Sequence, residues 1–554
     1  MAPRRIVSRI ALGPIVGHTD HQSSRVWIQV EDDPAFYRLR VYGVGLFQFA
    51  STEAPGRLEF RTAIAEVSGL RSDYLYRYSV VRGGRTIANG RGTFRTFPDP
   101  GSMAHITVCA VSCNVAEEEG QWAALGKYIA DARPQFLLMM GDQLYLDEGA
   151  EVNLFRDTTR HQPRAARRAA IVAKYRENWS RPLVRDVLAN IPVYMMWDDH
   201  DIRDGWGSTP ADSPTMVARY PRGRAIYELC RGYFEDCRDA YWHFQACHNP
   251  RPSNASVDPR LPNYANAPPA PGTRAAMPFV FRCGRLAVLV LDSRGERDVF
   301  REVRPILGER QWQFIDEVFA KLGPDVEALA VVTATPLTSI DPNGPTMKLM
   351  GDRTDDIEAF KRGDEKGTLD LSASTDADQL ALAVVNVHLS PKVSALTGQE
   401  LNLGGFKLSG IDEARDQWSH KFARREQVDL LRATGAALSV NRPPNGRRTP
   451  IFLAGDIHVG ARFQVTCEEP RYQALSLVAS GINVVFDEPP TIDVILSRDF
   501  DVAPGIHSKL LEVVTKYNFG VIEVLPTGTG AKVNGALAYE GVSVALGLDI
   551  SNYL

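Results

Sequence analysis

Residues of the types that bind metals and anions follow apolar, strand-like runs at five points of the sequence. The runs cover residues 106–111, 136–140, 193–197, 286–291 and 451–454. The polar segments after them are Ser112-Cys113-Asn114, Gly141 to Asp147, Asp198 to Asp204, Asp292-Ser293-Arg294, and Gly455 to Arg462. One aspartate after a strand is usually a cap, but strand ends in an open α/β sheet gather at the ligand-binding edge. Five such ends with Cys, Asp, Tyr, His and Arg predict a metal site that also binds an anion.

The elements that must position these residues follow an α/β pattern from about residue 104 onward. Short apolar runs alternate with amphipathic helical stretches, which is typical of strands that are buried on both faces. Residues 248–277, rich in Pro, Asn and Ala, predict a long surface loop. Residues 341–415 separate two segments of catalytic type and contain a further apolar run at 382–387. We interpret them as an insertion.

The first hundred residues have a different pattern. Alternating apolar and polar residues predict short strands at 25–30, 37–42, 58–64 and 74–80, with turn residues between them. Such spacing is typical of a small β-sandwich, and residues 67–78 resemble the segment that enters a late strand of fibronectin type III domains. Residues 97–102 read as a linker. We therefore expect a small all-β domain, fibronectin- or immunoglobulin-like, at 1–101 and a catalytic domain at 102–554.

Composition excludes several classes of protein. The chain has 554 residues, 44% of them hydrophobic and 23% charged, as expected of a globular enzyme. Its 63 basic and 67 acidic residues give a net charge of −4, which disfavours a nucleic-acid or acidic-membrane binder. Seven cysteines, an odd number in a large chain, favour reduced thiols.

The sequence also bears on location. No apolar run approaches the ~18 residues of a membrane-spanning helix. Arg4-Arg5 is similar to the start of a twin-arginine export signal, but the following apolar stretch is broken by Gly13 and Pro14. We expect a cytoplasmic protein, or a periplasmic or secreted one if this chain is a processed form. The oligomeric state is not readable.

The strand-end segments carry a resemblance to a known family. The sequence resembles the PhoD-like alkaline phosphatases of the calcineurin-like metallophosphatase superfamily. The matching segments are Ala110 to Asn114, Met140 to Tyr145, Trp197 to Asp201, Leu291 to Arg294, Leu307 to Trp312, Asp416 to Trp418 and Gly455 to His458. The resemblance implies a four-layer sandwich, in which two mixed sheets are flanked by helices, and an N-terminal β-domain also fits the family.

The resemblance implies a ligand set for two kinds of metal ion. Asp142 would bridge two metals, Cys113 would be a thiolate ligand to iron, and Tyr145 would bind ferric ion as phenolate. Asp456 and His458 would complete the centre. The second metal would be held by Asp199 or Asp204, whose carboxylates favour a hard ion such as Ca²⁺. We expect Fe³⁺ with Ca²⁺; Mn²⁺, Zn²⁺ and Mg²⁺ are the alternatives.

Other residues are assigned to substrate and to proton transfer. His200 would be the acid or the hydrogen-bond donor to the phosphoryl oxygen, with Asp201 beside it. Arg294 and Arg462 would bind phosphate, and Asn114 would touch the substrate. Asp416 and Trp418 would form a pocket wall. The superfamily's further histidine ligand is missing from residues 331–337; His388 is the alternative, although a strand histidine without a metal is more common.

The resulting expectation is a metal-dependent hydrolase of phosphoric esters, acting on monoesters, diesters or both. The first alternative is a phosphodiesterase of phospholipase D type that acts on phospholipid or polyol-phosphate polymers. The second is a silent phosphate-binding scaffold. Two further features have ordinary explanations that we favour: Cys230, Cys237 and Cys247 as core thiols rather than a zinc site, and the basic run 156–176 as a solvated helix face rather than a phosphate-steering surface.

Overall fold

The computed structural model describes residues 10–54, 59–147, 161–250, 274–344, 347, 355–369, 413–443, 446–486, 492 and 495–540. The predicted strand at 382–387 and His388 lie outside these residues. So does most of the predicted loop at 248–277.

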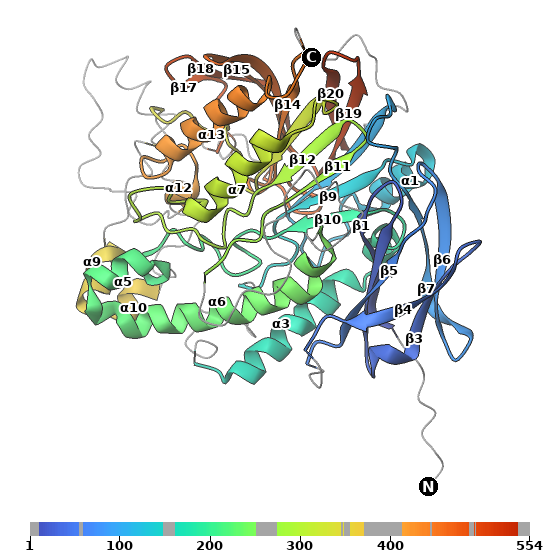
Figure 1. Ribbon diagram of the computed structural model, residues 1–554. Helices are drawn as coiled ribbons and strands as arrows, with labels where there is room; N and C mark the ends of the chain where they lie inside the picture. The colour runs from blue at the N-terminus through green and yellow to red at the C-terminus, as the bar shows by residue number, and fades with distance from the viewer. Residues whose placement is uncertain are drawn as a thin grey trace.

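Seven antiparallel strands form the N-terminal part, drawn in blue in Figure 1. They are β1 (Ile10–Thr19), β2 (Ser24–Val30), β3 (Tyr37–Val41), β4 (Gly45–Ser51), β5 (Thr62–Val67), β6 (Leu75–Arg82) and β7 (Arg85–Arg95). They pair in the order β1-β2-β5-β4-β3-β6-β7 and enclose one apolar cluster that includes Val26, Leu39 and Val80. The all-β character is as expected, while the fibronectin- or immunoglobulin-like assignment and the boundary at 101/102 stay predictions.

The outer face of these strands packs against the helices of the rest of the chain. Leu12, Trp27 and Phe60 belong to the same apolar cluster as Phe244 of helix α6 (Arg224–Phe244). The Trp27 indole N–H also donates to the His243 carbonyl oxygen at 2.9 Å. The N-terminal strands therefore share a core with the α/β part.

His243 should make the contact between the N-terminal strands and helix α6 sensitive to pH, and a first prediction follows. Burial and the Arg168 guanidinium lower the pKa of His243 to about 3. Its ring stacks on Phe60 at 4.4 Å, and its Nδ1 lies 2.9 Å from the Thr52 Oγ1. Since the unfolded chain binds a proton near pH 6.5 and the folded chain does not, stability falls as the pH drops from about 6.5 toward 3. At pH 5 this amounts to about 2 kcal/mol.

We expect His243→Gln to remove this part of the acid sensitivity. Thermal midpoints measured at pH 7 and pH 5 should then differ less for the variant than for the wild type. His161→Gln, at an exposed position, is the matched control and should behave as the wild type. Equal acid sensitivity in all three proteins would contradict the assignment.

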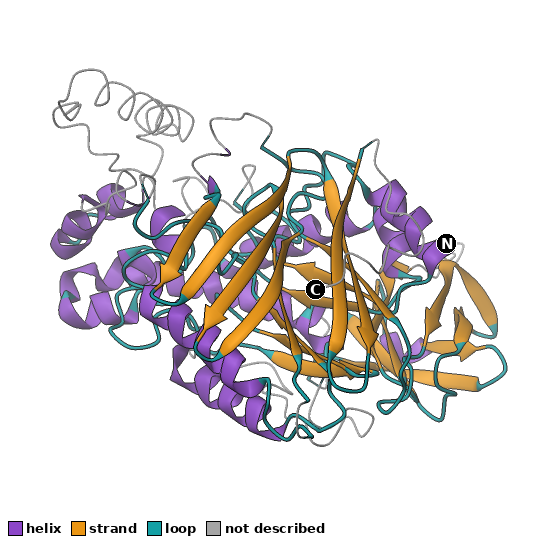
Figure 2. Ribbon diagram, turned by 90° about the horizontal axis from the view of Figure 1, so that it is seen from above, coloured by secondary structure: helices purple, strands orange, loops and turns teal. Residues whose placement is uncertain are grey.

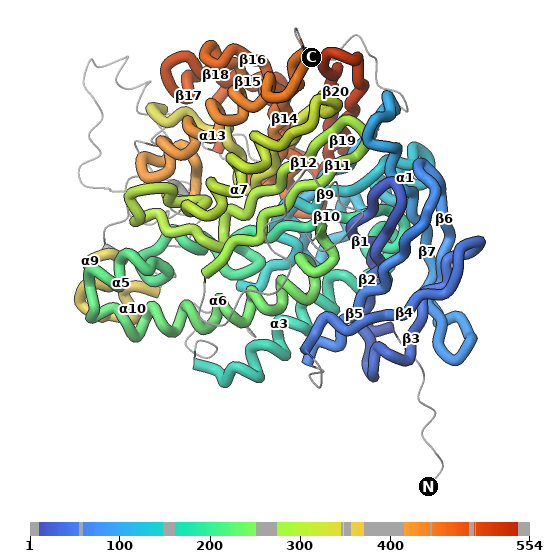
Figure 3. The backbone as a smooth tube through the Cα atoms, viewed as in Figure 1, coloured from blue at the N-terminus to red at the C-terminus, as the bar shows by residue number. Residues whose placement is uncertain are grey.

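Two mixed sheets form the centre of the molecule. The first has five strands in the order β10-β9-β8-β19-β20. In it β8 (Ile106–Val111), β9 (Phe136–Met140) and β10 (Val193–Met196) are parallel, while β19 (Asn518–Pro526) and β20 (Ala531–Tyr539) are antiparallel. The C-terminal hairpin therefore completes a sheet begun some 400 residues earlier (Figure 3).

The second sheet has eight strands in the order β11-β12-β13-β14-β16-β15-β18-β17. Its parallel centre consists of β12 (Leu286–Val290), β13 (Ala328–Val332), β14 (Thr449–Ala454) and β16 (Arg471–Val478). Its antiparallel strands are β11 (Phe279–Cys283), β15 (Gly460–Glu468), β17 (Asp499–Ala503) and β18 (Ile506–Val514). In the view of Figure 2 the strands lie between helices.

The apolar side chains show how the layers stack. In β9 the buried residues alternate: Phe136, Leu138 and Met140 face the cluster shared with the second sheet, while Leu137 and Met139 face helices. This is the period of two expected of a strand that is covered on both faces. The predicted arrangement of two mixed sheets with helices outside them is confirmed.

The helices divide between the two outer faces. Against the first sheet lie α1 (Trp122–Ala132), α3 (Arg164–Trp179), α4 (Pro182–Leu188) and α6. Against the second sheet lie α7 (Gly308–Lys321) and α13 (Arg424–Ala437). The described parts of the predicted insertion include α9 (Asp355–Arg362), α10 (Glu365–Leu369) and α12 (Glu413–Asp416). No helix among the described residues is long and apolar enough to cross a membrane.

Candidate metal centre

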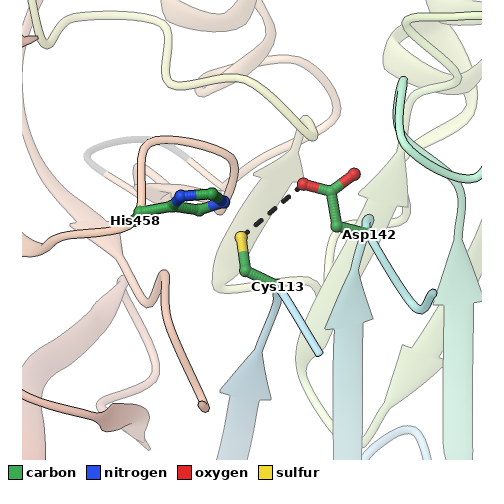
Figure 4. A group of neighbouring side chains, drawn as sticks. All are labelled: Cys113, Asp142 and His458. Carbon is green, nitrogen blue, oxygen red and sulfur yellow. Dashed lines mark hydrogen bonds between the residues drawn. The ribbon is translucent and has the colours of Figure 1, made fainter. Parts of the chain in front are cut away.

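The carboxyl ends of strands from both sheets meet at one place. Cys113 follows β8, Asp142 follows β9, and His458 follows β14 of the other sheet. One ligand atom from each of these three side chains lies within 4.8 Å of the others. Figure 4 shows the three side chains gathered above the strand ends. The convergence predicted from the sequence is therefore present.

The neighbours of these three residues fit a metal centre. The Cys113 Sγ lies 3.6 Å from the Asp142 Oδ2 and 3.2 Å from the Ser480 Oγ. The Tyr145 hydroxyl lies 2.8 Å from the His458 Nε2, so the phenol also reaches this group. Ser480 was not foreseen from the sequence, because it follows β16, for which no functional motif was recognised.

The backbone at the centre is held in a rarely used conformation. Cys113, Asp142, Asp456 and His458 have φ values of 59°, 51°, 72° and 53°, in the left-handed region. A residue with a Cβ is strained there, so such angles persist only where the surrounding structure enforces them. Four such residues around one point indicate that the side-chain directions are specified at a cost in stability.

The strand ends at Gly455 and Ser112 lie so close together that there is no room for a side chain on Gly455, and a second prediction follows from this. A Cβ on Gly455 would lie 2.3 Å from the Ser112 Oγ and 3.0 Å from the Met140 carbonyl oxygen. Ser112 precedes Cys113 and lies 3.1 Å from its Sγ. We expect Gly455→Ala to displace the Cys113 segment, to destabilise the protein by about 1–3 kcal/mol and to lower its metal content.

Gly126→Ala is the matched control for this variant. A Cβ there would meet its nearest neighbour, a methyl of Val187, at an ordinary 3.5 Å. Since Gly126 lies inside α1, alanine should be neutral or stabilising by up to about 1 kcal/mol. Urea unfolding and elemental analysis of both variants test the comparison; equal behaviour would contradict the role of the close approach.

A cluster of carboxylates adjoins the first group. Asp142, Asp198, Asp199 and Asp456 each place an oxygen within 4.8 Å of the others. Burial, and then the charges of Asp198 and Asp199, raise the pKa values of Asp142 and Asp456 well above the usual range. Within the described part of the chain, Asp142 Oδ1 and Asp198 Oδ2 are buried and accept no hydrogen bond. So many buried carboxylates close together repel one another, and a bound cation would offset both this repulsion and the cost of the unpaired oxygens.

The donors of the first group also fit a metal ion. Burial and then the Asp142 charge raise the pKa of the Cys113 thiol, so that without a cation this thiol stays protonated. Burial and then His200 lower the pKa of His458 to about 3, which keeps its imidazole neutral as a ligand requires. The residues present therefore fit the metal ions that the resemblance implies.

Asp198 is a member of this cluster that the sequence-based ligand set left out. It follows Trp197 directly, in the same run as the predicted Asp199. The neighbouring group consists of Asp199, His200 and Asp204, again with ligand atoms within 4.8 Å. Both residues considered for the second metal, Asp199 and Asp204, therefore belong to this group, and their role as ligands stays a prediction.

His200 is paired with Asp147, a second residue that the ligand set left out. The His200 Nδ1 lies 2.9 and 3.0 Å from the two carboxylate oxygens of Asp147, and the Tyr145 ring lies 4.3 Å from the His200 ring, centroid to centroid. Burial alone would lower the pKa of His200, but the Asp147 carboxylate outweighs it and raises that pKa. The available signal was position: Asp147 ends the polar run that Asp142 begins.

Asp201 and Asn114 are placed differently from the prediction. The Asp201 carboxylate accepts backbone N–H groups of Asp198 and Gln143 and the side-chain amide of Gln245, at 2.9–3.3 Å. The Asn114 amide is buried and bonds to Trp122, Asn178 and Arg181. These contacts occupy both side chains inside the protein and brace the loops that carry Cys113 and His200.

The prediction that Arg294 binds phosphate is wrong, because its guanidinium group is already occupied by carboxylates. The guanidinium is fully buried and forms ion pairs with Asp198, with Asp199 at 3.3 Å, and with both oxygens of Asp416. Asp416 is therefore the partner of an arginine rather than a pocket wall. Burial raises the pKa of the Asp416 carboxyl, but Arg294 and Arg297 outweigh burial and hold that pKa at about 2.

The remaining predicted substrate residues lie in other surroundings. Arg462, in β15, donates to the Gly535 carbonyl oxygen and pairs with Glu512. Trp418 is buried in the apolar cluster between the second sheet and α7 and α13. Neither contact places these side chains at the metal ligands.

The two features with ordinary explanations are also accounted for. Cys230, Cys237 and Cys247 are buried and form no disulfide, and none of the metal-ligand groups found among the described residues includes them. In the basic run, Arg164, Arg167 and Arg168 form ion pairs with acids that include Asp236 and Glu59. These three arginines therefore fasten α3 to its neighbours, and the expected solvated face is wrong for Arg167 and Arg168, whose side chains are only 14% exposed. Arg156 and Arg160 lie outside the described residues.

The chain is similar to known phosphatases in fold and in sequence pattern. The solved structure of PhoD is similar at 14% identity with a TM-score of 0.54, over 100% of this chain and 93% of that one. The structure of a purple acid phosphatase from yellow lupin (Lupinus luteus) seeds matches at 10% identity with a TM-score of 0.44, over 95% and 71% of the two chains. No curated protein matches. The family model of the PhoD-like phosphatases matches residues 106–488. Since that match covers more than half of the chain and includes every strand end described above, the chain belongs to the PhoD-like phosphatase family.

Proposed function

We propose that this protein hydrolyses phosphoric esters with Fe³⁺ and a hard divalent ion, Ca²⁺, and that it acts on monoesters, diesters or both. The observation that carries the proposal is that Cys113, Asp142 and His458 meet beside an adjoining set of carboxylates, of which Asp142 is also a member. Thiolate and imidazole donors suit a softer or ferric ion, whereas carboxylates suit a hard divalent ion.

The proposal assigns each metal to its own residues. Cys113, Tyr145 and His458 would hold the ferric ion, and Asp199 and Asp204 would hold the divalent ion. Asp142 would face both, since it belongs to the thiolate group and to the carboxylate cluster; Asp198 and Asp456 supply further oxygens there. Bound metal ions at such a site neutralise phosphate charge and acidify a water molecule.

The chain's own residues supply orientation and a proton. The His200 Nδ1 is hydrogen-bonded to Asp147, so Nε2 is the ring nitrogen that can contact the substrate ester. A protonated Nε2 would donate to a phosphoryl oxygen or to the leaving alkoxide. The Tyr145 ring beside it restricts rotation of the imidazole.

Nitrophenyl substrates test this function. We expect the metal-loaded protein to release nitrophenol from nitrophenyl phosphate or from bis-nitrophenyl phosphate, and His200→Ala to be slower by about a hundred-fold or more. The ratio of the two rates separates monoesterase from diesterase activity. Equal rates for the wild type and His200→Ala would remove His200 from the reaction, and no release with any metal would favour the binding scaffold.

Asp147 provides a sharper prediction, as a positioning residue. We expect Asp147→Asn to lower kcat by about 10–100-fold with KM nearly unchanged, because the amide cannot stabilise a protonated His200. The alkaline limb of the kcat profile should also move to lower pH, since a raised His200 pKa depends on the Asp147 charge.

The control is Asp131→Asn, which removes an exposed ion pair with Lys127 and should leave both readouts unchanged. Combining Asp147→Asn with His200→Ala should cost no more than His200→Ala alone. Additive losses would show that Asp147 acts independently of His200.

A further inference from the structure

A pocket outside the metal centre has a volume of about 410 Å³. It lies among the end of α5 (Pro214–Arg219), the segment 299–302, α9 and residues 421–422. The first segment follows β10, whose carboxyl end leads to Asp198 and Asp199 of the metal centre, and the second follows β12, whose carboxyl end leads to their ion-pair partner Arg294. Figure 1 shows α5 and α9 side by side, as their contacts with the turn at 221–223 also indicate. The pocket therefore opens among loops that leave the catalytic edge of the sheets.

Basic side chains dominate its polar lining: Arg219, Arg301, Lys361 and Lys421 against the single acid Glu302. The Arg301 guanidinium is fixed by carbonyl groups, with Nε 3.1 Å from the Arg304 oxygen and NH2 3.0 Å from the Glu296 oxygen. Carbonyl partners hold the group in place without cancelling its charge. Arg219 is exposed and forms no ion pair with any residue that the structure describes.

Aromatic rings form the apolar walls of the same pocket. They belong to Tyr220, Phe300 and Phe422. The Phe300 and Phe422 ring centroids lie 5.9 Å apart, and the Lys361 Nζ lies 5.1 Å above the Tyr220 ring. All three aromatic residues are partly exposed. A ligand ring could thus gain stacking contacts while an anionic group stays within reach of the cations.

We propose that this pocket binds an aromatic phosphate, of which a nucleoside monophosphate is the common biological form. Its base would pack against Phe422 and the neighbouring rings, and its phosphate would pair with Arg219 and Arg301, since the Lys361 Nζ already lies 2.7 Å from the Glu358 carboxylate. A ligand without a ring would forfeit the aromatic contacts, and one without a negative charge would not form ion pairs with Arg219 and Arg301. The inference does not depend on hydrolysis, because none of the metal-centre residues lines this pocket.

The test is calorimetric titration of the metal-loaded protein with the phosphonate analogue of adenosine monophosphate, whose P–C bond resists hydrolysis. We expect Arg219→Gln and Phe422→Leu each to weaken its binding by about tenfold. Methylphosphonate, which lacks the ring, should bind the wild type at least about tenfold more weakly than the adenosine phosphonate does. The matched control is Arg362→Gln, next to Lys361 but outside the pocket lining, which should bind as the wild type does.

Asp142→Asn separates this site from the metal centre. The proposal predicts that this variant still binds the adenosine phosphonate, even if it hydrolyses nothing. Binding that disappears in Asp142→Asn but survives in Arg219→Gln and Phe422→Leu would place the ligand at the metal centre and overturn the proposal. No binding by the wild type would overturn it as well. Nitrophenyl ester assays on the same proteins report separately on the hydrolase.

Discussion

Replacing Asp142 by asparagine is expected to lower kcat/KM for nitrophenyl esters by about a thousand-fold or more, the equivalent of some 4 kcal/mol of lost charge stabilisation. Asp142 is the one residue that belongs both to the thiolate group and to the carboxylate cluster. Asparagine has nearly the same shape, but its amide cannot supply a charged oxygen to each of two metal ions. The protein should lose bound metal from both sites at once.

Elemental analysis of Asp142→Asn beside Asp204→Asn tests this difference. Asp204 belongs only to the group with Asp199 and His200, so its loss should deplete the divalent ion and leave iron bound. Asp142→Asn should also fold as the wild type does, because removing one charge from a crowded set of buried carboxylates relieves repulsion. Retained iron and calcium in Asp142→Asn would contradict the proposal that Asp142 holds both metals.

Replacing Arg294 by methionine is expected to destabilise the protein by about 3–5 kcal/mol, because it leaves buried carboxylates without their cation. Arg294 is fully buried between Asp198 and Asp416, and the pKa of the Asp416 carboxyl is held at about 2 largely by its charge. The account therefore predicts a large fall in the thermal midpoint and weaker metal binding through Asp198 and Asp199.

The alternative, in which Arg294 binds phosphate, predicts the opposite pattern: a raised KM with little change in stability. Arg462→Gln is the control, since its pairing with Glu512 is partly exposed and should contribute less than about 1 kcal/mol. A stable Arg294→Met protein with a raised KM alone would restore the phosphate-binding assignment.

The part of the fold that sequence reasoning could predict is the part with the strongest apolar pattern. Strands β8, β9, β10, β12 and β14 lie within one or two residues of the bounds expected from the sequence, because each is buried on both faces. The strand expected at 58–64 was wrong in its position, since β5 begins at Thr62. The Glu53 carboxylate accepts the backbone N–H groups of residues 59, 60 and 61 and turns the chain there.

The C-terminal strands β15 to β20 were missed for a different reason. Their pairing is long-range: β19 joins β8, and β15 lies between β16 and β18. Nothing local in residues 460–539 states which sheet each strand enters. The order of the strands is therefore determined only by the long-range pairing in the two assembled sheets.

The candidate site divides in the same way. Strand-end position located the segments, and the resemblance to the PhoD-like phosphatases singled out Cys113, Asp142, Asp199, His200, Asp456 and His458, which the structure brings into overlapping groups. The sequence could not tell which charged groups face a ligand and which face each other. Arg294, Asp416 and Asp201 carry the right chemistry, but their partners lie on segments distant in sequence. Asp147 and Asp198 belong to the same polar runs, but their partners, His200 and Arg294, are known only from the structure.

The most direct test of the central claim is the metal content of the purified protein together with its visible spectrum. The account predicts iron and a second, divalent metal in the same molecule, with a charge-transfer band that is lost or shifted in Cys113→Ser and in Tyr145→Phe. A protein that stays metal-free and colourless after reconstitution with iron and calcium would contradict it, and would leave a phosphatase fold used for binding.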